Sequence, residues 1–167
     1  MNNSLANIFR FILFLMLQLL LFNSIDFLGY LNPFPYVLYI ILFPVNGNKP
    51  TLLATSFLLG LLLDIFTNSG GVHATASLIL AYVRPSIFKF SFGLSYEYQT
   101  VKIADKITPE RISFLILAIF IHHLFLFLLE FFRLSLIVSV IGRTLLATIF
   151  TFFMCLLIIY LIKPNKR

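Results

Sequence analysis

Charged residues are scarce in this sequence. They make up 11% of its 167 residues, whereas an average soluble domain contains roughly 25%. Hydrophobic residues make up 60%, and phenylalanine alone occurs 21 times. Because so few polar side chains cannot cover the surface of a water-soluble globule, the composition predicts an integral membrane protein.

Cysteine and catalytic motifs are also lacking. The one cysteine, Cys155, lies within an apolar run, which excludes a disulfide framework and a thiolate metal cluster. There is no Gly-rich phosphate loop and no HExxH motif, and the adjacent His122 and His123 would diverge by about 100° on a helix. We therefore expect a protein that is not an enzyme and holds no cofactor or metal. Its net charge of +6 indicates basic cytoplasmic loops rather than nucleic-acid binding.

Apolar segments, by contrast, are abundant. They predict a single all-α membrane domain over residues 1–167, with six transmembrane helices at about 8–22, 31–43, 51–66, 72–83, 112–129 and 144–162. Asn32-Pro33, Pro50 and Thr108-Pro109 supply typical helix starts. The first segment follows Arg10, as in a signal peptide, but no small-x-small cleavage site comes after it, so we expect it to be retained.

The longest polar stretch is residues 84–111, which Arg84-Pro85 separates from the fourth segment. We expect it to be a cytoplasmic loop, either lying on the bilayer, where aromatic and basic side chains are favoured, or docking a partner. The alternating Phe88, Phe90 and Phe92 also suggest a short strand within it.

The positions of Lys and Arg predict the orientation. With six spans and both termini in the cytoplasm, ten of the twelve basic residues face the cytoplasm and only Arg133 and Arg143 lie outside, as the positive-inside preference requires. Segments 31–43 and 72–83 are shorter than the roughly 20 residues that a spanning helix needs. If both are re-entrant, the chain has four spans, and only the side of Lys49 separates the two arrangements.

Polar side chains inside these segments are the candidate functional residues, since each is costly in lipid. They are Asp64, His73, His122 and Glu130, all in the outer half of the six-span arrangement. Asp64 either reaches the headgroups or accepts hydrogen bonds from His73, His122 or the free backbone N–H groups near Gly70-Gly71. Glu130 and Arg133 are spaced to pair on one helix face.

Residues 50–82, PTLLATSFLLGLLLDIFTNSGGVHATASLILAY, resemble the signature region of MreD, a family of bacterial rod shape-determining proteins. That family shows a proline-led helix, a Gly-x-x-x-Asp ending, a Gly-containing turn and a His-led helix that ends in Tyr. The matching residues are Pro50, Gly60, Asp64, Gly71, His73 and Tyr82. The turn 67–71 is polar, where many members have a proline or leucine. We expect Gly60, Asp64, Gly71 and His73 to form a structural cluster that holds this hairpin together.

The resemblance implies a non-catalytic scaffold of the cell-elongation complex in the bacterial inner membrane. The expected partners are membrane lipid and an MreC-like protein, with the MreB filament, RodA and its transpeptidase as further partners in peptidoglycan synthesis. The family is similar in fold to the substrate-binding subunits of energy-coupling-factor vitamin transporters, so a small-molecule (vitamin-type) binding subunit is the alternative function. The Ala-x-x-x-Ala seam of helix one in those subunits is absent from ANIFRFILFLMLQLLL, which favours the scaffold.

Overall fold

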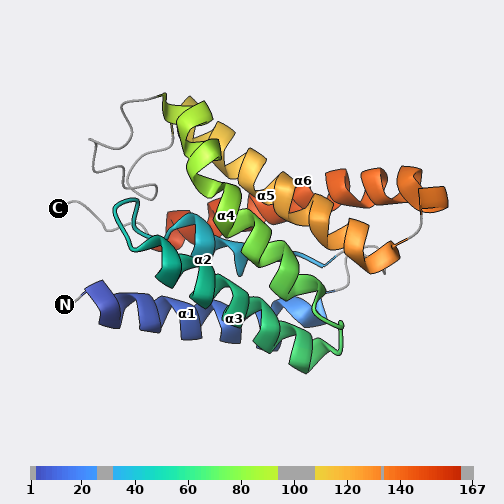
Figure 1. Ribbon diagram of the computed structural model, residues 1–167, viewed down its shortest axis with the longest axis horizontal. Helices are drawn as coiled ribbons and strands as arrows, with labels where there is room; N and C mark the ends of the chain where they lie inside the picture. Colours follow the sequence, from blue (N-terminus) through green and yellow to red (C-terminus); the bar gives the residue numbers. More distant parts are fainter. Residues whose placement is uncertain (1–2, 26–31, 94–107, 133, 163–167) are drawn as a thin grey trace.

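Helices account for the regular structure of the chain (Figure 1). The computed structural model describes residues 3–25, 32–93, 108–132 and 134–162, and within them it contains no strand. The elements are α1 (Asn3–Leu20), η1 (Phe22–Ser24), α2 (Val37–Ile41), α3 (Lys49–Thr67), α4 (Val72–Phe92), α5 (Pro109–Phe131), η3 (Leu134–Leu136) and α6 (Ile137–Ile162). The predicted all-helical class is confirmed.

Four stretches are long and apolar enough to cross a membrane. They are Leu5–Ser24, Lys49–Thr67, Pro109–Phe131 and Ile137–Ile162. Large apolar side chains project outward from the first and last of them, such as Phe9, which is 63% exposed, and Val138, which is 79% exposed. Such faces are stable in lipid and costly in water, so the chain is a multi-pass membrane protein.

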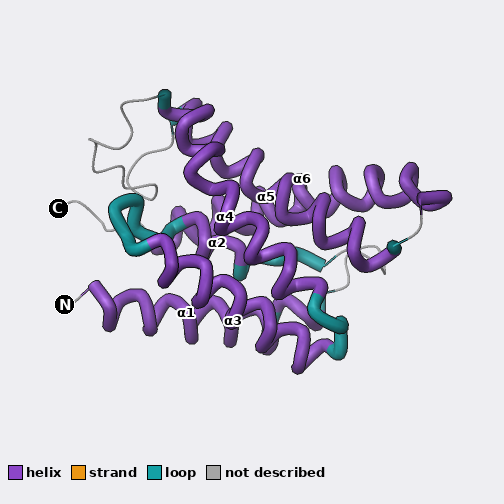
Figure 2. Tube along the Cα trace, in the orientation of Figure 1, coloured by secondary structure: helices purple, strands orange, loops and turns teal. Residues whose placement is uncertain are grey.

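Successive helices run in alternating directions (Figures 1 and 2). The starts of α1 and α3 and the ends of α4 and α6 lie at one end of the molecule, which we call the first end. The turn between α3 and α4 and the start of α6 lie at the opposite, second end. α3 packs on α4, α4 on α5, and α5 on α6, while α1 packs on α3.

The second predicted segment, 31–43, is mostly not a helix. Of its described residues, only Val37–Ile41 are α-helical, because Pro33 and Pro35 each disfavour helical backbone in the residue before them. The short helix α2 is nevertheless the centre of the fold. All five of its residues are buried, and it contacts α1, α3, α4 and α5.

The fourth predicted segment, 72–83, continues well beyond its expected end. α4 passes through Pro85 and ends at Phe92, so residues 84–92 are helical rather than part of the expected loop 84–111 or of a short strand. The proline removes one helical hydrogen bond. Packing offsets this loss, since the Phe88 ring lies 5.4 Å from Phe92 and 4.1 Å from Phe114 of α5. Residues 94–107, the remainder of that loop, lie outside the described residues.

Candidate functional site

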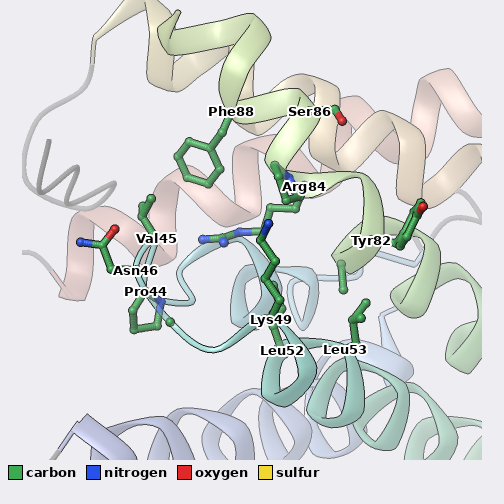
Figure 3. A pocket seen from close by; sticks show the side chains of 13 residues that line it. Pro44, Val45, Asn46, Lys49, Leu52, Leu53, Tyr82, Arg84, Ser86 and Phe88 are labelled. Atoms are coloured by element: carbon green, nitrogen blue, oxygen red, sulfur yellow. The ribbon is translucent and has the colours of Figure 1, made fainter. Parts of the chain in front are cut away.

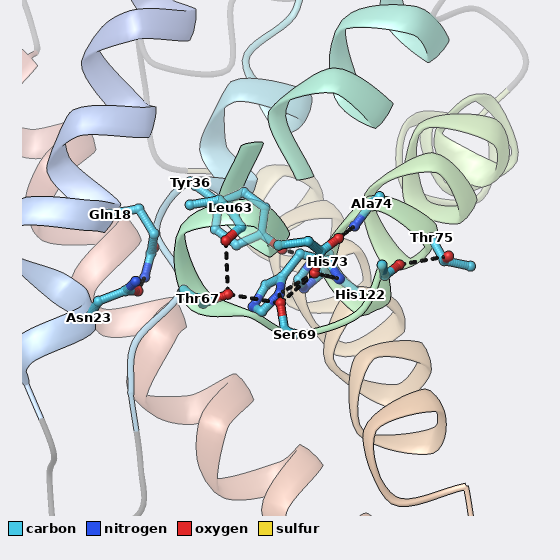
Figure 4. Close-up of polar contacts among 12 residues, drawn as sticks. Gln18, Asn23, Tyr36, Leu63, Thr67, Ser69, His73, Ala74, Thr75 and His122 are labelled. Carbon is cyan, nitrogen blue, oxygen red and sulfur yellow. Dashed lines mark hydrogen bonds and ion pairs between the residues drawn. The ribbon is translucent and has the colours of Figure 1, made fainter. Parts of the chain in front are cut away.

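The carboxylate of Asp64 is the hub of the candidate site (Figure 4). Asp64 lies in the last turn of α3 and is only 5% exposed. Its Oδ1 accepts hydrogen bonds from the backbone N–H of His73 at 3.0 Å and from Ser69 Oγ at 2.5 Å. The ring Nδ1 of His73 lies 3.0 Å from the same oxygen. Its Oδ2 accepts from the backbone N–H of Ala74 at 2.8 Å.

These contacts make Asp64 a cap for a helix to which it does not belong. The first N–H groups of any helix have no acceptor within it, and a negative charge is favoured at that end. The residue at the N-cap position of α4 is Gly71, which has no side chain to accept them. The carboxylate from α3 takes that place, so one side chain joins the end of one helix to the start of the next. These are hydrogen bonds expected for Asp64 from the sequence.

The turn between the two helices requires unusual backbone. Asn68, Gly70 and Gly71 have φ angles of 54°, 68° and 94°, in the left-handed region that glycine adopts without steric cost. The backbone N–H groups of Asn68 and Ser69 both donate to the carbonyl of Asp64. Of the polar side chains in this turn, the Ser69 hydroxyl also donates to the same aspartate.

Gly60 marks the closest approach of α3 and α4. A Cβ atom built on it would lie 2.4 Å from the carbonyl oxygen of His73 and 2.5 Å from the Cα of Ala74. Any side chain here would force the two backbones apart, so the glycine permits the spacing at which Asp64 reaches the start of α4. Gly60, Asp64, Gly71 and His73 therefore lie in one cluster.

His122 is connected to this cluster through the segment before α2. It is fully buried, and its Nε2 lies 2.7 Å from the hydroxyl of Tyr36, so it does not bond to Asp64, which was its expected alternative partner. The Tyr36 ring lies 6.0 Å from the ring of His73 and 5.3 Å from that of His122. A buried tyrosine thus joins α4 to α5.

His123 anchors the same segment to α6. Its Nε2 lies 3.3 Å from Thr151 Oγ1, and the same hydroxyl oxygen accepts from the backbone N–H of Phe34 at 3.1 Å. The Phe34 ring lies 5.7 Å from His73 and 5.5 Å from His123. The two adjacent histidines therefore bind different partners, as their divergence on a helix predicts.

Glu130 is exposed and lies outside this hydrogen-bonded cluster. It lines a pocket of about 590 Å³ at the second end, together with His73 and Ser69. Its expected partner, Arg133, lies outside the described residues, so the predicted salt bridge stays a prediction.

The arrangement favours bracing over chemistry. Ser69, His73 and Asp64 lie together, but Ser69 and Asp64 both contact Nδ1 of the imidazole, whereas a nucleophile–base–acid relay uses the two opposite ring nitrogens. Within the described ranges there is no group of three or more His, Cys, Asp or Glu side chains that could hold a metal ion.

Comparisons with known proteins add no relative. No family model, curated protein or solved structure matches the chain. What the protein does must therefore be inferred from the geometry of the site and from the resemblance of residues 50–82.

A second buried charge, that of Arg84, lies toward the first end (Figure 3). The sequence predicts this residue at the start of a loop. Arg84 of α4 is only 4% exposed. Its Nη2 donates to the carbonyl of Ile41, 3.3 Å away, and to that of Phe43, and its guanidinium lies 4.7 Å from the centre of the Phe88 ring. Arg84 and Lys49 line a second pocket of about 640 Å³.

These networks include residues that were not among the sequence candidates, such as Tyr36, Ser69 and Arg84. Tyr36 lies in an apolar run where nothing distinguishes it from its neighbours. Arg84 precedes a proline, which is a signal for the end of a helix and thus for an exposed side chain. Ser69 could have been found, because serine in a polar turn after an aspartate commonly bonds to nearby backbone or carboxylate groups.

Proposed function

We propose that this protein is a non-catalytic scaffold of the MreD type in the bacterial inner membrane, which binds an MreC-like partner and links MreB filaments to peptidoglycan synthesis. One observation carries the proposal. The stretch that resembles the MreD signature, residues 50–82, covers α3 and the first half of α4, although α4 does not end at Tyr82 but continues to Phe92. Gly60, Asp64, Gly71 and His73 lie together where the two helices meet. These residues hold the two helices in register.

The proposal includes six crossings with both termini in the cytoplasm, in a fold like that of the vitamin-binding transporter subunits. α4 has 21 residues and is about 32 Å long, which is sufficient to cross. The short helix α2 within the second segment is shielded by α1, α3, α4 and α5. Among the described basic residues, Lys49, Lys89 and Arg111 lie in the terminal turns of α3, α4 and α5 at the first end. Arg10 and Arg84 lie in the halves of α1 and α4 nearer that end, whereas Arg143 lies in the half of α6 nearer the second end. This supports a cytoplasmic first end.

Thiol labelling tests the topology. In a Cys155→Ser background, single cysteines replace Asn46 at the first end and Asn68 at the second, and intact cells are treated with a membrane-impermeant reagent. We expect Asn68→Cys to be labelled at once and Asn46→Cys only after the membrane is permeabilised. The reverse pattern, in which Asn46→Cys is labelled in intact cells and Asn68→Cys only after permeabilisation, would support four spans instead.

The scaffold role is tested by partner recovery. Asp64→Leu removes the cap from α4, so the hairpin loses its fixed register. We expect several-fold weaker co-purification with an MreC-like partner, measured on monodisperse protein in mild detergent. Gly60→Ala, which separates the same helices without removing a charge, should give a similar loss. Normal recovery of the complex with normal cell width would contradict the scaffold.

A second candidate function is favoured by the pocket at the second end. Its volume of about 590 Å³ lies within the usual range for small-molecule sites. A small-molecule binding subunit of a transporter would retain a ligand during gentle purification. Mass spectrometry of an extract of the purified protein, with saturable rebinding of any compound found, tests this alternative.

A further inference from the structure

The pocket at the second end combines polar and apolar walls. Three parts of the chain surround it: the segment after α1, the turn between α3 and α4, and the last turns of α5. Figure 4 shows Asn23, Thr67, Ser69 and His73 in this region. Its apolar side chains are Phe34, Val72, Leu126 and Leu129. These walls suit a ligand with an alkyl chain.

Among the lining residues that the structure describes, the charge has one sign. Glu130 is exposed and is the one charged residue besides His73 in that part of the lining. It forms no hydrogen bond or ion pair with any residue that the structure describes. Arg143, at the same end, lies 4.9 Å from the centre of the Phe131 ring and is not a lining residue. The described part of the pocket wall therefore offers a carboxylate and no basic side chain.

His73 adds an oriented acceptor. An ionised carboxylate has only acceptor sites, so the Nδ1 of His73, 3.0 Å from Asp64 Oδ1, donates to it. In a neutral imidazole the other nitrogen, Nε2, then carries a lone pair. Nε2 has no hydrogen-bond partner among the described residues, and the side chain is 12% exposed. Asp64 thus fixes the tautomer that presents an acceptor at the pocket wall.

From the carboxylate, the oriented lone pair and the apolar wall, we propose that this pocket binds an alkylammonium group. Glu130 supplies the counter-charge, His73 Nε2 accepts one N–H, and the apolar wall packs the alkyl chain. The ammonium belongs either to a free small amine or to a lysine side chain of a partner polypeptide, since both present the same chemistry. The inference rests on the second candidate function, because it names the ligand class for that pocket.

A matched pair of probes tests the ammonium. N-acetyl-lysine amide and N-acetyl-norleucine amide share a backbone and an unbranched alkyl chain, and only the first carries the charge. Each is dialysed to equilibrium against the full-length protein in detergent, at a pH where histidine is neutral. We expect saturable binding of the lysine compound and at least about tenfold weaker binding of the norleucine compound.

Two glutamates on the same helix provide the control. Glu130→Gln removes the exposed counter-charge without disturbing the core, and it should weaken binding of the lysine compound by about tenfold. Glu110→Gln changes an exposed glutamate in the first turn of α5, at the opposite end of the molecule, and should leave binding unchanged. If both probes bind equally well and Glu130→Gln does not change their binding, the ammonium site is overturned while small-molecule binding is left intact. No saturable binding of either probe would overturn the ammonium site, whereas small-molecule binding is overturned only if the purified protein also yields no extractable ligand.

Once the lysine compound is found to bind, two further measurements identify the source. An amine extracted from the wild-type protein but not from Glu130→Gln assigns the site to a small molecule. A carbodiimide cross-link that joins Glu130 itself to a lysine of a second polypeptide assigns it to a protein partner.

Discussion

The two ends of the α3–α4 hairpin use buried charges of opposite sign for the same purpose. At the second end, the carboxylate of Asp64 accepts the free N–H groups at the start of α4. Toward the first end, the guanidinium of Arg84 donates to two carbonyls: that of Ile41, the last residue of α2, and that of Phe43, which follows the helix. A negative charge suits a helix start and a positive charge suits a helix end, so each charge is placed where backbone groups need it.

The two caps differ in what their loss leaves behind. Removing Asp64 orphans backbone N–H groups, which are rarely left unpaired in buried positions, whereas removing Arg84 orphans carbonyls, which tolerate this somewhat better. The comparison predicts that the second end is the more sensitive of the two.

The largest effect is expected at Asp64. Asp64→Leu leaves the N–H groups of His73 and Ala74 without acceptors, and each such group costs about 1 to 3 kcal/mol. We expect the free energy of unfolding to fall by about 2 to 6 kcal/mol, measured by denaturation of the purified protein in detergent. Asp64→Asn, which keeps one acceptor oxygen, should lose less. If both variants were as stable as the wild type, the capping role would be wrong.

Gly60 tests whether the spacing at this end matters as much as the charge. Gly60→Ala places a Cβ against the backbone of α4, and overpacking of this kind costs about 1 to 3 kcal/mol. Gly142→Ala is the control, because a Cβ on Gly142 meets nothing within 4 Å. Since alanine is the better helix former, that control should gain about 0.5 to 1 kcal/mol. Equal effects of the two substitutions would argue against a close helix contact at residue 60.

The smallest effect is expected at Arg84. Arg84→Met keeps the length and apolar stem of the side chain but removes its hydrogen bonds to Ile41 and Phe43. We expect a loss of about 1 to 2 kcal/mol, measured in the same denaturation series. Lys89→Met, a change at an exposed residue of the same helix, should be near neutral. A loss at Arg84 larger than that at Asp64 would reverse the comparison between the two ends.

Much of the structure at the second end was predictable, because the residues that interact there lie close together in the sequence. Asp64, the glycines of the turn and His73 lie within ten residues of one another, and a carboxylate in an apolar run needs donors. The starts of α3 and α5 were predictable for a similar reason, since Pro50 and Pro109 lie in the first turn of each helix.

The first end was not predictable, because its interactions join residues far apart in the sequence. Arg84 and Ile41 are separated by 43 residues, and nothing near either one specifies the contact. The local signal was misleading as well: Pro85 indicated the end of a helix, but packing of Phe88 on Phe114 sustains α4 beyond it. For the same reason Tyr36 was missed, since its partner His122 lies 86 residues away.

The missing side chain at position 60 has a mechanical consequence. With backbone atoms of α4 already within 2.6 Å of where a Cβ would be, neither helix can slide or roll on its neighbour without collision, because packed interiors resist continuous deformation. We therefore expect α3 and α4 to move together as one unit. A displacement at the start of α3 would then be carried to the turn beyond Thr67, on the opposite side of the bilayer if the hairpin spans it.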